Sequence, residues 1–383
     1  MRTARIAIVG GGLSGLYAAF LLEKKGIKDY VLLEAREALG GRIACVTSSG
    51  HSPAGTAGAG EGIDRFDLGP TWFWPDLQPE LDRLIDDLGL TRFEQHESGD
   101  MVVERSPIEP PVRARGFVNS PASMRLVGGM GALVDALHRR LDPARIVTGQ
   151  TVRHLRRADH HIEVDSADAR GGITTWRVEH VLLAMPPRLA EDTIAFTPAL
   201  PQALARQWRA TATWMASHAK YVAIYDTPFW REQGQSGEAR SARGPLVEIH
   251  DASMPGGSAA LFGFFGLPAR ARKSVPEDVL RSHCRAQLTR LFGARAATPK
   301  ADLIKDWAFD PYTATGTDLD GAGQHAAAPS AVVPSGPWNA CLTGIASEWS
   351  RQFPGYVAGA IEAARIGVQA LPECTVEEGE QRR

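Results

Sequence analysis

The chain has 383 residues, of which 44% are hydrophobic and 22% charged, and its formal net charge at pH 7 is −2. This composition is typical of a folded globular protein and excludes a wholly disordered chain. Because the charge is near zero, no general field attracts nucleic acid or an anionic membrane, and we expect neither as a partner. A prior of ~150 residues per domain predicts two or three domains.

Cysteine and histidine placement excludes several metal and redox sites. The four cysteines form no C-x-x-C pair, which excludes a zinc ribbon and a thioredoxin-like motif. Their scatter favours free thiols in a reducing compartment, and we expect a cytoplasmic protein. His160 and His161 would face opposite sides of a strand, so we expect no metal site.

No part of the sequence is typical of a membrane span or a signal peptide. The apolar N-terminal run carries four glycines, and no small-residue cleavage site follows it. No other stretch reaches the ~18 apolar residues that a transmembrane helix needs.

The first 35 residues predict a strand, a turn, a helix and a second strand. Residues 4–9 form a β-branched run typical of a buried parallel strand. After a cluster of glycines, residues 16–26 have helical periodicity and end at Gly26, a residue typical of helix C-termini. Residues 30–34 predict the next strand.

The remaining elements follow from periodicity and from turn residues. We expect helices at 77–90, 128–141, 276–293 and 356–371. We expect strands at 181–184, 218–226, 259–266 and 341–344, with several more between 146 and 182. Loops are expected at 48–62, 105–116 and 232–244, residues 313–337 show no clear periodicity, and the polar end at 373–383 is expected to fray.

A G-x-G-x-x-G motif at Gly10, Gly12 and Gly15 lies between the first strand and the first helix. Gly10 permits a tight turn, Gly12 lets a pyrophosphate approach the backbone, and Gly15 lets the helix pack against the sheet. The helix N-terminus offers unpaired N–H groups to the phosphates. Glu34 lies 19 positions after Gly15, where an acidic residue accepts hydrogen bonds from a ribose. The sequence therefore predicts dinucleotide binding.

The string VGGGLSGL…LLEAREALGGR, which ends at Arg42, resembles the start of the flavin-dependent amine oxidases, the monoamine oxidase group. In that group FAD lies along this motif, and the Gly-Gly-Arg segment wraps the pyrophosphate. An arginine suits this role because its guanidinium pairs bidentately with phosphate.

The resemblance continues in order over nearly the whole chain. Its further landmarks are 66–72, 125–131, Val152, 181–187, 219–220, 228–230, 306–307, Tyr312, 343–344 and 355–361. It implies contacts to FAD from Gly10, Gly12, Leu13, Ser14, Gly15, Glu34, Ala35, Arg36, Gly41, Arg42, Gly69, Pro70, Thr71, Trp72, Val152, Trp307, Gly344, Ile345, Tyr356 and Val357.

The resemblance assigns catalytic roles to three side chains and a flavin contact to a fourth. Lys220 matches the lysine that holds a water near flavin N5, where it helps oxygen attack or delivers water to the imine. Tyr312 and Tyr356 match two aromatic residues that flank the amine in a narrow apolar slot. Trp307 matches the aromatic residue that packs against the flavin ring.

The sequence departs from the family pattern at two places that matter. Gly316 stands where mammalian monoamine oxidases attach FAD to a cysteine, so we expect non-covalent FAD. L-Amino acid oxidases hold the substrate carboxylate with an arginine, but residues 70–74 here are Pro-Thr-Trp-Phe-Trp. An aromatic wall without a cation favours an amine that lacks an α-carboxylate.

The resemblance implies an α/β fold, with a Rossmann-like FAD-binding domain of the glutathione-reductase and amine-oxidase type and a second, α+β substrate domain. We expect the FAD-binding domain to comprise 1–76, 125–190 and 306–383. We expect the substrate domain to comprise 77–124 and 191–305.

The implied reaction is the oxidation of a small-molecule amine. A hydride passes from Cα to flavin N5, the imine hydrolyses, and O₂ is reduced to H₂O₂. The alternatives are a flavin-dependent C–C desaturase or dehydrogenase of the same superfamily, and a FAD-binding protein without turnover. An aryl amine, an alkyl amine and a polyamine all remain open as substrates, and so does the oligomeric state.

Overall fold

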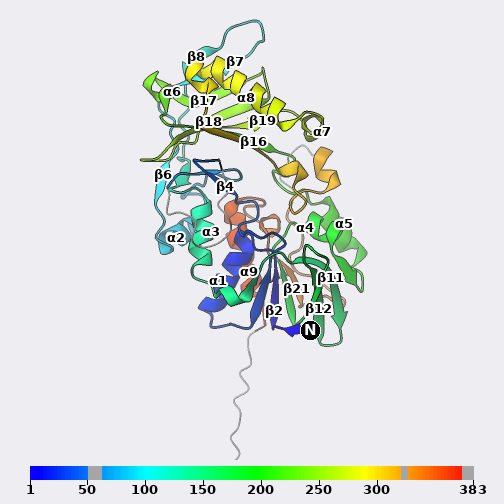
Figure 1. Cartoon of the computed structure of the whole chain (residues 1–383). Coiled ribbons are helices and arrows are strands. Elements are labelled where there is room, and N and C mark those ends of the chain that lie inside the picture. The colour runs from blue at the N-terminus through cyan, green and yellow to red at the C-terminus, as the bar shows by residue number, and fades with distance from the viewer. Residues whose placement is uncertain (51–62, 321–326, 373–383) are drawn as a thin grey trace, which may run out of the picture.

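The computed structural model describes residues 1–50, 63–320 and 327–372. Our expectations for residues 51–62, for 321–326 within the 313–337 stretch and for the end at 373–383 lie outside the described residues. Within the described chain, two five-stranded sheets and one seven-stranded sheet form the framework. Figure 1 shows the seven-stranded sheet at the opposite end of the molecule from the other two.

The first sheet is parallel throughout, with strand order β10-β3-β2-β14-β21. β2 and β3 are buried on both faces, as their unbroken apolar sequences predict. This confirms the Rossmann-like α/β arrangement. The strands are β2 (Ile6–Val9), β3 (Tyr30–Leu33), β10 (Ile146–Val147), β14 (His180–Leu183) and β21 (Leu342–Gly344).

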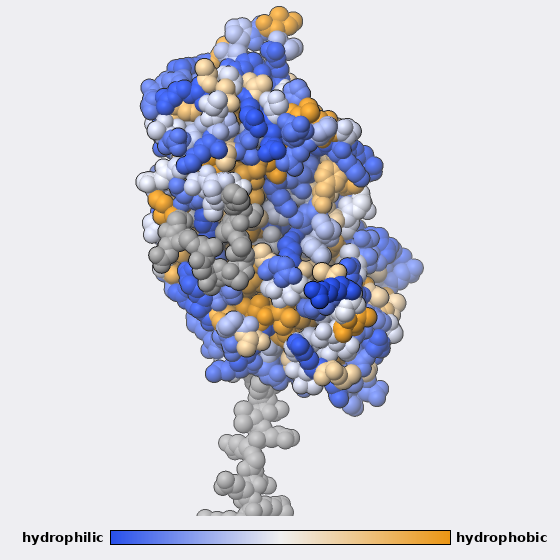
Figure 2. Space-filling view, in the orientation of Figure 1, coloured by the Kyte–Doolittle hydropathy of each residue, from blue (hydrophilic) through white to orange (hydrophobic). Residues whose placement is uncertain are grey.

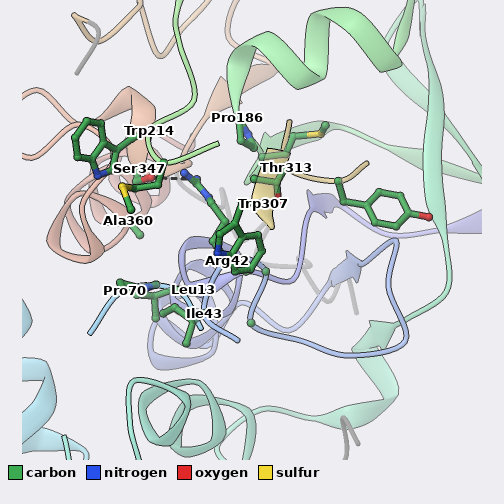
Figure 3. Close-up of a pocket in the computed structure, with 18 of the residues that line it drawn as sticks. Leu13, Arg42, Ile43, Pro70, Pro186, Trp214, Trp307, Thr313, Ser347 and Ala360 are labelled. Atoms are coloured by element: carbon green, nitrogen blue, oxygen red, sulfur yellow. Dashed lines mark hydrogen bonds between the residues drawn. The ribbon is translucent and has the colours of Figure 1, made fainter. Parts of the chain in front are cut away.

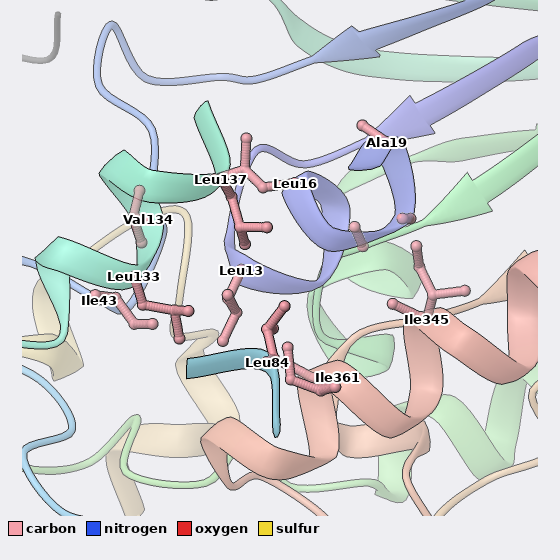
Figure 4. Packing of buried hydrophobic residues seen from close by; sticks show 14 of the residues in the cluster. Leu13, Leu16, Ala19, Ile43, Leu84, Leu133, Val134, Leu137, Ile345 and Ile361 are labelled. Atoms are coloured by element: carbon pink, nitrogen blue, oxygen red, sulfur yellow. The ribbon is translucent and has the colours of Figure 1, made fainter. Parts of the chain in front are cut away.

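A separate hydrophobic core covers each face of the parallel sheet. On one face, alternate residues of β2 pack against α1 (Leu13–Lys24), α3 (Gly131–His138) and α9 (Val357–Gln369), whose side chains interlock in Figure 4. On the other face, Ala7 and Val9 pack against the second sheet. Because successive side chains of a strand alternate between faces, one short strand serves both cores.

The second sheet has the order β1-β13-β12-β11-β15 and a central antiparallel part. It lies over the face of the parallel sheet that α1 leaves open. Its strands are β1 (Arg2–Thr3), β11 (Thr151–Ala158), β12 (His161–Ala167), β13 (Ile173–Val178) and β15 (Ala195–Thr197).

The third sheet has the order β20-β16-β19-β18-β17-β7-β8, and its neighbours are antiparallel except for β17 and β7. The helix α8 (Glu277–Phe292) packs on one face of this sheet, and a second hydrophobic cluster covers the other face at β16. Both faces of β16 are therefore buried. The strands are β7 (Asp100–Glu104), β8 (Val112–Arg115), β16 (Ala219–Tyr225), β17 (Gln235–Ser241), β18 (Leu246–Asp251), β19 (Ala259–Phe265) and β20 (Ala301–Asp306).

Short elements connect these sheets. They are β4 (Cys45–Thr47), β5 (Arg65–Asp67), β6 (Arg92–Glu94), β9 (Met124–Leu126), α2 (Pro79–Asp87), α4 (Pro187–Thr193), α5 (Gln202–Ala210), α6 (Phe229–Glu232), α7 (Ala269–Lys273), η1 (Pro143–Arg145), η2 (Ala294–Ala297), η3 (Trp307–Phe309), η4 (Gly316–Asp320) and η5 (Ser347–Trp349).

Two expected loops contain strands instead. Residues 232–244 include β17, and residues 105–116 include β8. β17 has the sequence QSGEARS, which lacks alternation, and β8 alternates over only four residues, VRAR, in a segment rich in proline and arginine. Both form strands because neighbours in the sheet pair with them, on both edges in the case of β17. Tertiary pairing here overrides local propensity.

The core contacts of two segments bear on where the domain boundaries lie. Leu81 and Leu84 of α2 lie in the core of the parallel sheet, although 77–124 was assigned to the substrate domain. Leu204 and Trp208 of α5 also lie in a core of that sheet, although 191–305 was assigned to the substrate domain. We therefore propose the five-segment division with α2 and residues 191–210 moved to the dinucleotide-binding side.

The molecular face in Figure 2 carries apolar side chains in small groups separated by polar ones. Within residues 1–50, 63–320 and 327–372, the helices lack the combination of length and hydropathy that a membrane crossing requires.

Candidate active site

A cavity of about 700 Å³ lies between the parallel sheet and the seven-stranded sheet. Its walls include the ends of β2 and β3, the glycine turn before α1, residues of β16, β18 and β19, and the start of α9. Residues as distant in sequence as Val9 and Ala360 therefore meet at this cavity. Its volume falls in the range of small-molecule and cofactor sites.

The glycine turn between β2 and α1 forms part of the cavity wall. A Cβ at Gly10, where φ is +112°, would lie 2.7 Å from the Ala184 carbonyl oxygen, and a Cβ at Gly15 would lie 2.0 Å from the Gly10 oxygen. Both positions need glycine for internal packing. A Cβ at Gly12 would meet nothing nearer than 3.9 Å, and Gly12 caps α1 without a side-chain hydrogen bond. The first N–H groups of α1 therefore border the cavity as an anion site requires.

Glu34 lies at the carboxyl end of β3, where the cavity meets the second sheet. Its Oε2 accepts a hydrogen bond from Gly11 N at 2.6 Å, and its Oε1 accepts one from Arg36 N at 2.8 Å. A carboxylate has about four acceptor sites, so two remain for a diol. Gln150 N donates to the Glu34 carbonyl oxygen, which brings Val152 to the same end of the cavity.

The Arg42 guanidinium is held bidentately by Glu348, which is 3% exposed. Arg42 Nη2 also donates to Ser347 Oγ at 3.2 Å. These contacts use three of the five N–H donors of the arginine, and the other two remain for an anion in the cavity. Arg42 is thus neither a solvated surface charge nor wholly available to a phosphate.

Lys220 projects from β16 into the cavity although its side chain is almost fully buried. Its Nζ donates to Thr71 Oγ1 at 2.6 Å and to the Gly69 carbonyl oxygen at 3.1 Å. Nζ also lies 4.0 Å from the ring centroid of Phe262. Among the described residues no carboxylate forms an ion pair with this nitrogen, and these polar and aromatic groups stabilise it instead.

The surroundings of Lys220 favour the neutral amine. Burial lowers the pKa of Lys220 to about 7, an effect that the charge of Asp67 opposes and that of Arg125 reinforces. A neutral lysine nitrogen has two N–H bonds, and Thr71 and Gly69 accept both of them. The remaining lone pair is then available to a proton donor in the cavity.

Trp307 is held rigidly in the cavity wall next to the Lys220 contacts. Its Nε1 donates to the Leu68 carbonyl oxygen at 3.1 Å, and the Lys305 ammonium lies 4.3 Å from its ring centroid. The side chain is 5% exposed, and this small exposed part borders the cavity.

A group of four aromatic side chains forms another part of the cavity wall. They come from three separate segments, and they are Trp72, Trp74, Trp214 and Tyr356. Trp74 packs edge-on against Tyr356 with ring centroids 6.5 Å apart. Phe73, which the sequence placed in this wall, points away into the core and is 0% exposed, because alternate residues of an extended segment face opposite sides.

Tyr312 and Tyr356 both line the cavity, but Tyr312 has its own partner at the Glu34 end. Its ring lies 5.1 Å from the Arg36 guanidinium, at the Glu34 end of the cavity. Tyr356 precedes α9, and its carbonyl oxygen accepts a hydrogen bond from Ala360 N. Figure 3 shows Ala360 and Trp214 well apart from Thr313, the neighbour of Tyr312. A slot between these two tyrosines stays a prediction, and the contact with Arg36 favours a place for Tyr312 nearer the dinucleotide.

Most of the other predicted contacts line the cavity. These are Gly10, Gly12, Leu13, Glu34, Ala35, Arg36, Gly41, Arg42, Gly69, Pro70, Thr71, Trp72, Val152, Trp307 and Val357. Ser14, Gly15, Gly344 and Ile345 are not among the cavity-lining residues. Ser14 and Ile345 are buried, and a Cβ at Gly344 would lie 2.1 Å from the Trp349 ring, so packing accounts for these positions.

Three residues of the site carry no sequence signal, namely Trp214, Glu348 and Glu248, which lies on β18. Trp214 lines the cavity and packs closely on Gly355. A Cβ at position 355 would lie only 2.5 Å from the Trp214 Cβ. Glu348 reaches Arg42 across more than 300 residues of sequence. No local pattern marks these residues.

Two family models match the chain. The model described as flavin containing amine oxidoreductase matches residues 113–371. The model described as NAD(P)-binding Rossmann-like domain matches residues 8–88. Together they match the segments from β2 to the end of α2 and from β8 to the end of α9.

Similar curated proteins are flavin enzymes. The chain is 29% identical over 251 residues to a probable flavin-containing monoamine oxidase A of Dictyostelium discoideum, covering 62% of this chain and 51% of the relative. It is 22% identical to putrescine oxidase of Kocuria rosea, covering 94% of each chain. Matches to the first of these relatives and to its mycobacterial counterparts span about half of their length.

Solved structures with the same fold include a redesigned putrescine oxidase, with a TM-score of 0.77 at 20% identity, covering 96% of this chain and 98% of that one. Cyclohexylamine oxidase from Brevibacterium oxydans has a TM-score of 0.75 at 18% identity, with 96% and 98% coverage. At these identities the likeness establishes the fold.

Proposed function

Because the chain belongs to the family of flavin containing amine oxidoreductases, we propose that it binds FAD and oxidises a C–N bond of a small-molecule amine. FAD is the cofactor of this family. When bound, it supplies the two-electron oxidation of the substrate carbon and the transfer of those electrons to O₂, which yields H₂O₂. Water completes the balance by converting the imine to a carbonyl compound and a released amine or ammonia.

The dinucleotide end of the cavity fits FAD. The open position at Gly12 leaves space where a pyrophosphate approaches the N-terminus of α1. The remaining N–H donors of Arg42 suit the same phosphates, and the remaining acceptor sites of Glu34 suit a ribose diol.

We propose that FAD is held without a covalent bond. Among the described cysteines, Cys45, Cys284 and Cys341 are buried free thiols outside the cavity wall, and Cys374 lies beyond the described residues. Gly316 has no side chain that attaches a flavin.

Lys220 performs the proton chemistry in this proposal. Its neutral nitrogen accepts a proton from the water that attacks the imine, while Thr71 and the Gly69 carbonyl oxygen fix its position. The protonated form then places a positive charge beside the site where O₂ accepts electrons. Both roles need the pKa near neutrality that burial produces.

The aromatic end of the cavity orients the substrate. Trp72, Trp74, Trp214 and Tyr356 exclude water and hold the carbon chain beside Lys220. Lys220 and His218 are among the described basic side chains that line the cavity, and burial lowers the pKa of His218. Because residues 70–74 of the aromatic wall carry no cation, we propose that the substrate is an amine lacking an α-carboxylate.

The observation that carries the proposal is that a dinucleotide cradle, a buried lysine and four aromatic side chains line one cavity. A peroxide-coupled screen of amines on the purified holoprotein tests it. We expect H₂O₂, carbonyl product and released amine or ammonia in equal amounts. Dye reduction without H₂O₂ would identify a dehydrogenase, and turnover without released nitrogen would identify a C–C desaturase.

A further inference from the structure

A second cavity, of about 530 Å³, lies apart from the candidate active site, and within the described chain the two share no lining residue. It is bounded by β6 and the residues that follow it, the segment before β9, the helix α6 and the turn after β18. Its apolar side chains are Phe93, Val118, Ala122, Met254 and Pro255. The volume falls in the range of small-molecule sites, and the proposed function makes no use of it.

Arg125 brings a buried positive charge to the wall of this cavity. Its side chain is 1% exposed, and Nη1 and Nη2 donate to the carbonyl oxygens of Ser253 and Ala252 at 3.1 and 2.8 Å. Among the described residues, Nε has no hydrogen-bond partner and no carboxylate forms an ion pair with the guanidinium. The Phe93 ring, whose centroid lies 5.0 Å from Cζ, stabilises the charge only in part. A buried charge of this kind is costly unless an anion completes its surroundings.

Two further side chains of the cavity wall have hydrogen-bonding capacity that a ligand can use. Arg231 holds both carboxylate oxygens of Asp251 through Nε and Nη2, which leaves Nη1 for a ligand. Nε2 of His96 is buried and lacks a hydrogen-bond partner within residues 1–50, 63–320 and 327–372. His96 can present an N–H at this atom, either as one tautomer or when protonated. Donors from three separate segments therefore border one cavity.

Two acidic residues also border the cavity, but they do not neutralise Arg125. Glu94 is exposed, and both carboxylate oxygens of Glu97 accept hydrogen bonds from Asn119. The buried side of the cavity therefore carries the charge of Arg125. An oxyanion fits that side, and the apolar side chains fit a small hydrocarbon body attached to it.

Two residues of the second cavity hold the aromatic wall of the active site. Gln95 Oε1 accepts a hydrogen bond from Trp72 Nε1 at 2.8 Å, and Ser123 Oγ accepts one from Trp74 Nε1 at 3.1 Å. Gln95 and Ser123 line the second cavity, whereas the two tryptophans line the first. A ligand in contact with Gln95 or Ser123 therefore acts directly on a tryptophan of the active site.

We propose that the second cavity binds a small organic carboxylate through Arg125 and Arg231, and that the bound carboxylate is an effector of the active site. Binding is independent of the proposed function, whereas the effector role rests on it. The basis is a buried guanidinium that lacks an ion pair among the described residues, in a cavity hydrogen-bonded to the aromatic wall.

The test measures binding of hexanoate and benzoate to the holoprotein by calorimetry, with hexanamide and benzamide as neutral matches. Arg125→Met removes the buried charge. Arg115→Met is the matched control, because Arg115 is an exposed residue of β8 that lines neither cavity. Ala122→Trp places a bulky ring at the exposed rim, so it obstructs the cavity without removing a charge. This variant keeps the test decisive should Arg125→Met fail to fold.

We expect both carboxylates to bind and both amides to bind at least about tenfold more weakly. Carboxylate affinity should fall about tenfold or more in Arg125→Met and in Ala122→Trp, but not in Arg115→Met. Bound carboxylate should also change the KM for amines by about fivefold, and Ala122→Trp should abolish this change.

Absence of binding overturns the inference, and so does equal binding of the amides. Carboxylate binding that survives both cavity substitutions places the ligand elsewhere, the active-site cavity included, and also overturns it. An unchanged KM for amines overturns the effector role. If no amine is oxidised, the proposed function fails, and calorimetry still decides whether the second cavity takes a carboxylate.

Discussion

Lys220 is the residue whose chemistry depends most on its surroundings. Residues of β16 with the same parity as Lys220 face the cavity side, and those of the other parity face α8. A surface lysine would remain charged at neutral pH, whereas burial brings the pKa of Lys220 to about 7. The sequence motif located this residue, but its ionisation state depends on its burial in the folded structure.

Replacing Lys220 with methionine should slow reoxidation of the reduced flavin by about 10²-fold. Methionine fills a similar volume but neither carries charge nor moves a proton. The rate is measured by mixing the anaerobically reduced protein with O₂, and retention of FAD is the control. Unchanged reoxidation would contradict the role assigned to Lys220.

The same pKa predicts an acid limb in the pH profile of the rate of carbonyl release from the imine. Above pH 7 the neutral amine of Lys220 predominates and accepts a proton, whereas below pH 7 the ammonium form cannot. This rate should therefore fall as the pH drops through about 7. The limb should vanish in the Lys220→Met variant, and its persistence there would assign it to another group, such as His218.

Replacing Tyr356 and replacing Tyr312 should affect different properties of the protein. Tyr356→Leu removes part of the aromatic substrate wall and should lower kcat/KM for amines by about tenfold. Tyr312→Leu removes the ring that stacks on Arg36 and should weaken FAD binding while leaving amine kinetics at saturating FAD nearly unchanged. Steady-state kinetics and FAD titration separate the two, and similar losses of kcat/KM for amines in both variants would instead support a slot between the tyrosines.

At the scale of elements, the three glycines of the turn between β2 and α1 are needed for two different reasons, internal packing and ligand binding. Gly10 and Gly15 are fixed by contacts within the protein, whereas the space beside Gly12 is open. A glycine that internal packing does not demand indicates a demand from the ligand.

Gly12→Ala should therefore weaken FAD binding by about tenfold or more and change the unfolding free energy of the apoprotein by less than about 1 kcal/mol. Gly15→Ala should destabilise the apoprotein by about 1–3 kcal/mol or more, because its Cβ would overlap the Gly10 oxygen. FAD titration and denaturant unfolding measure the two effects. Equal losses of stability in both variants would show that Gly12 also serves packing.

Periodicity predicted the elements with strong local signals and missed those that depend on neighbours. The helix expected at 276–293 is observed as α8, and the strand expected at 259–266 is observed as β19. β17 was missed because its sequence, QSGEARS, lacks alternation and forms a strand only through pairing. In the site, motifs located the glycine turn and Lys220, while Trp214 and Glu348 arrive by tertiary contacts that no local pattern records.

At the scale of the whole molecule, the cavity joins segments from the start, middle and end of the chain. Bound FAD contacts all of them in our proposal, so it should stabilise the folded chain as a unit. At free FAD about 100 times Kd, the expected gain is about 2.7 kcal/mol. Thermal unfolding at several FAD concentrations measures it. Denaturation should release the whole flavin, and retained flavin would contradict non-covalent binding.

The most direct test of the central claim is anaerobic titration of the purified holoprotein with amines, followed by the flavin absorbance. The account predicts that one equivalent of a suitable amine bleaches one equivalent of flavin and yields one equivalent of carbonyl compound. Flavin that remains oxidised with every alkyl, aryl and diamine tested would contradict the account and leave a FAD-binding protein without this chemistry.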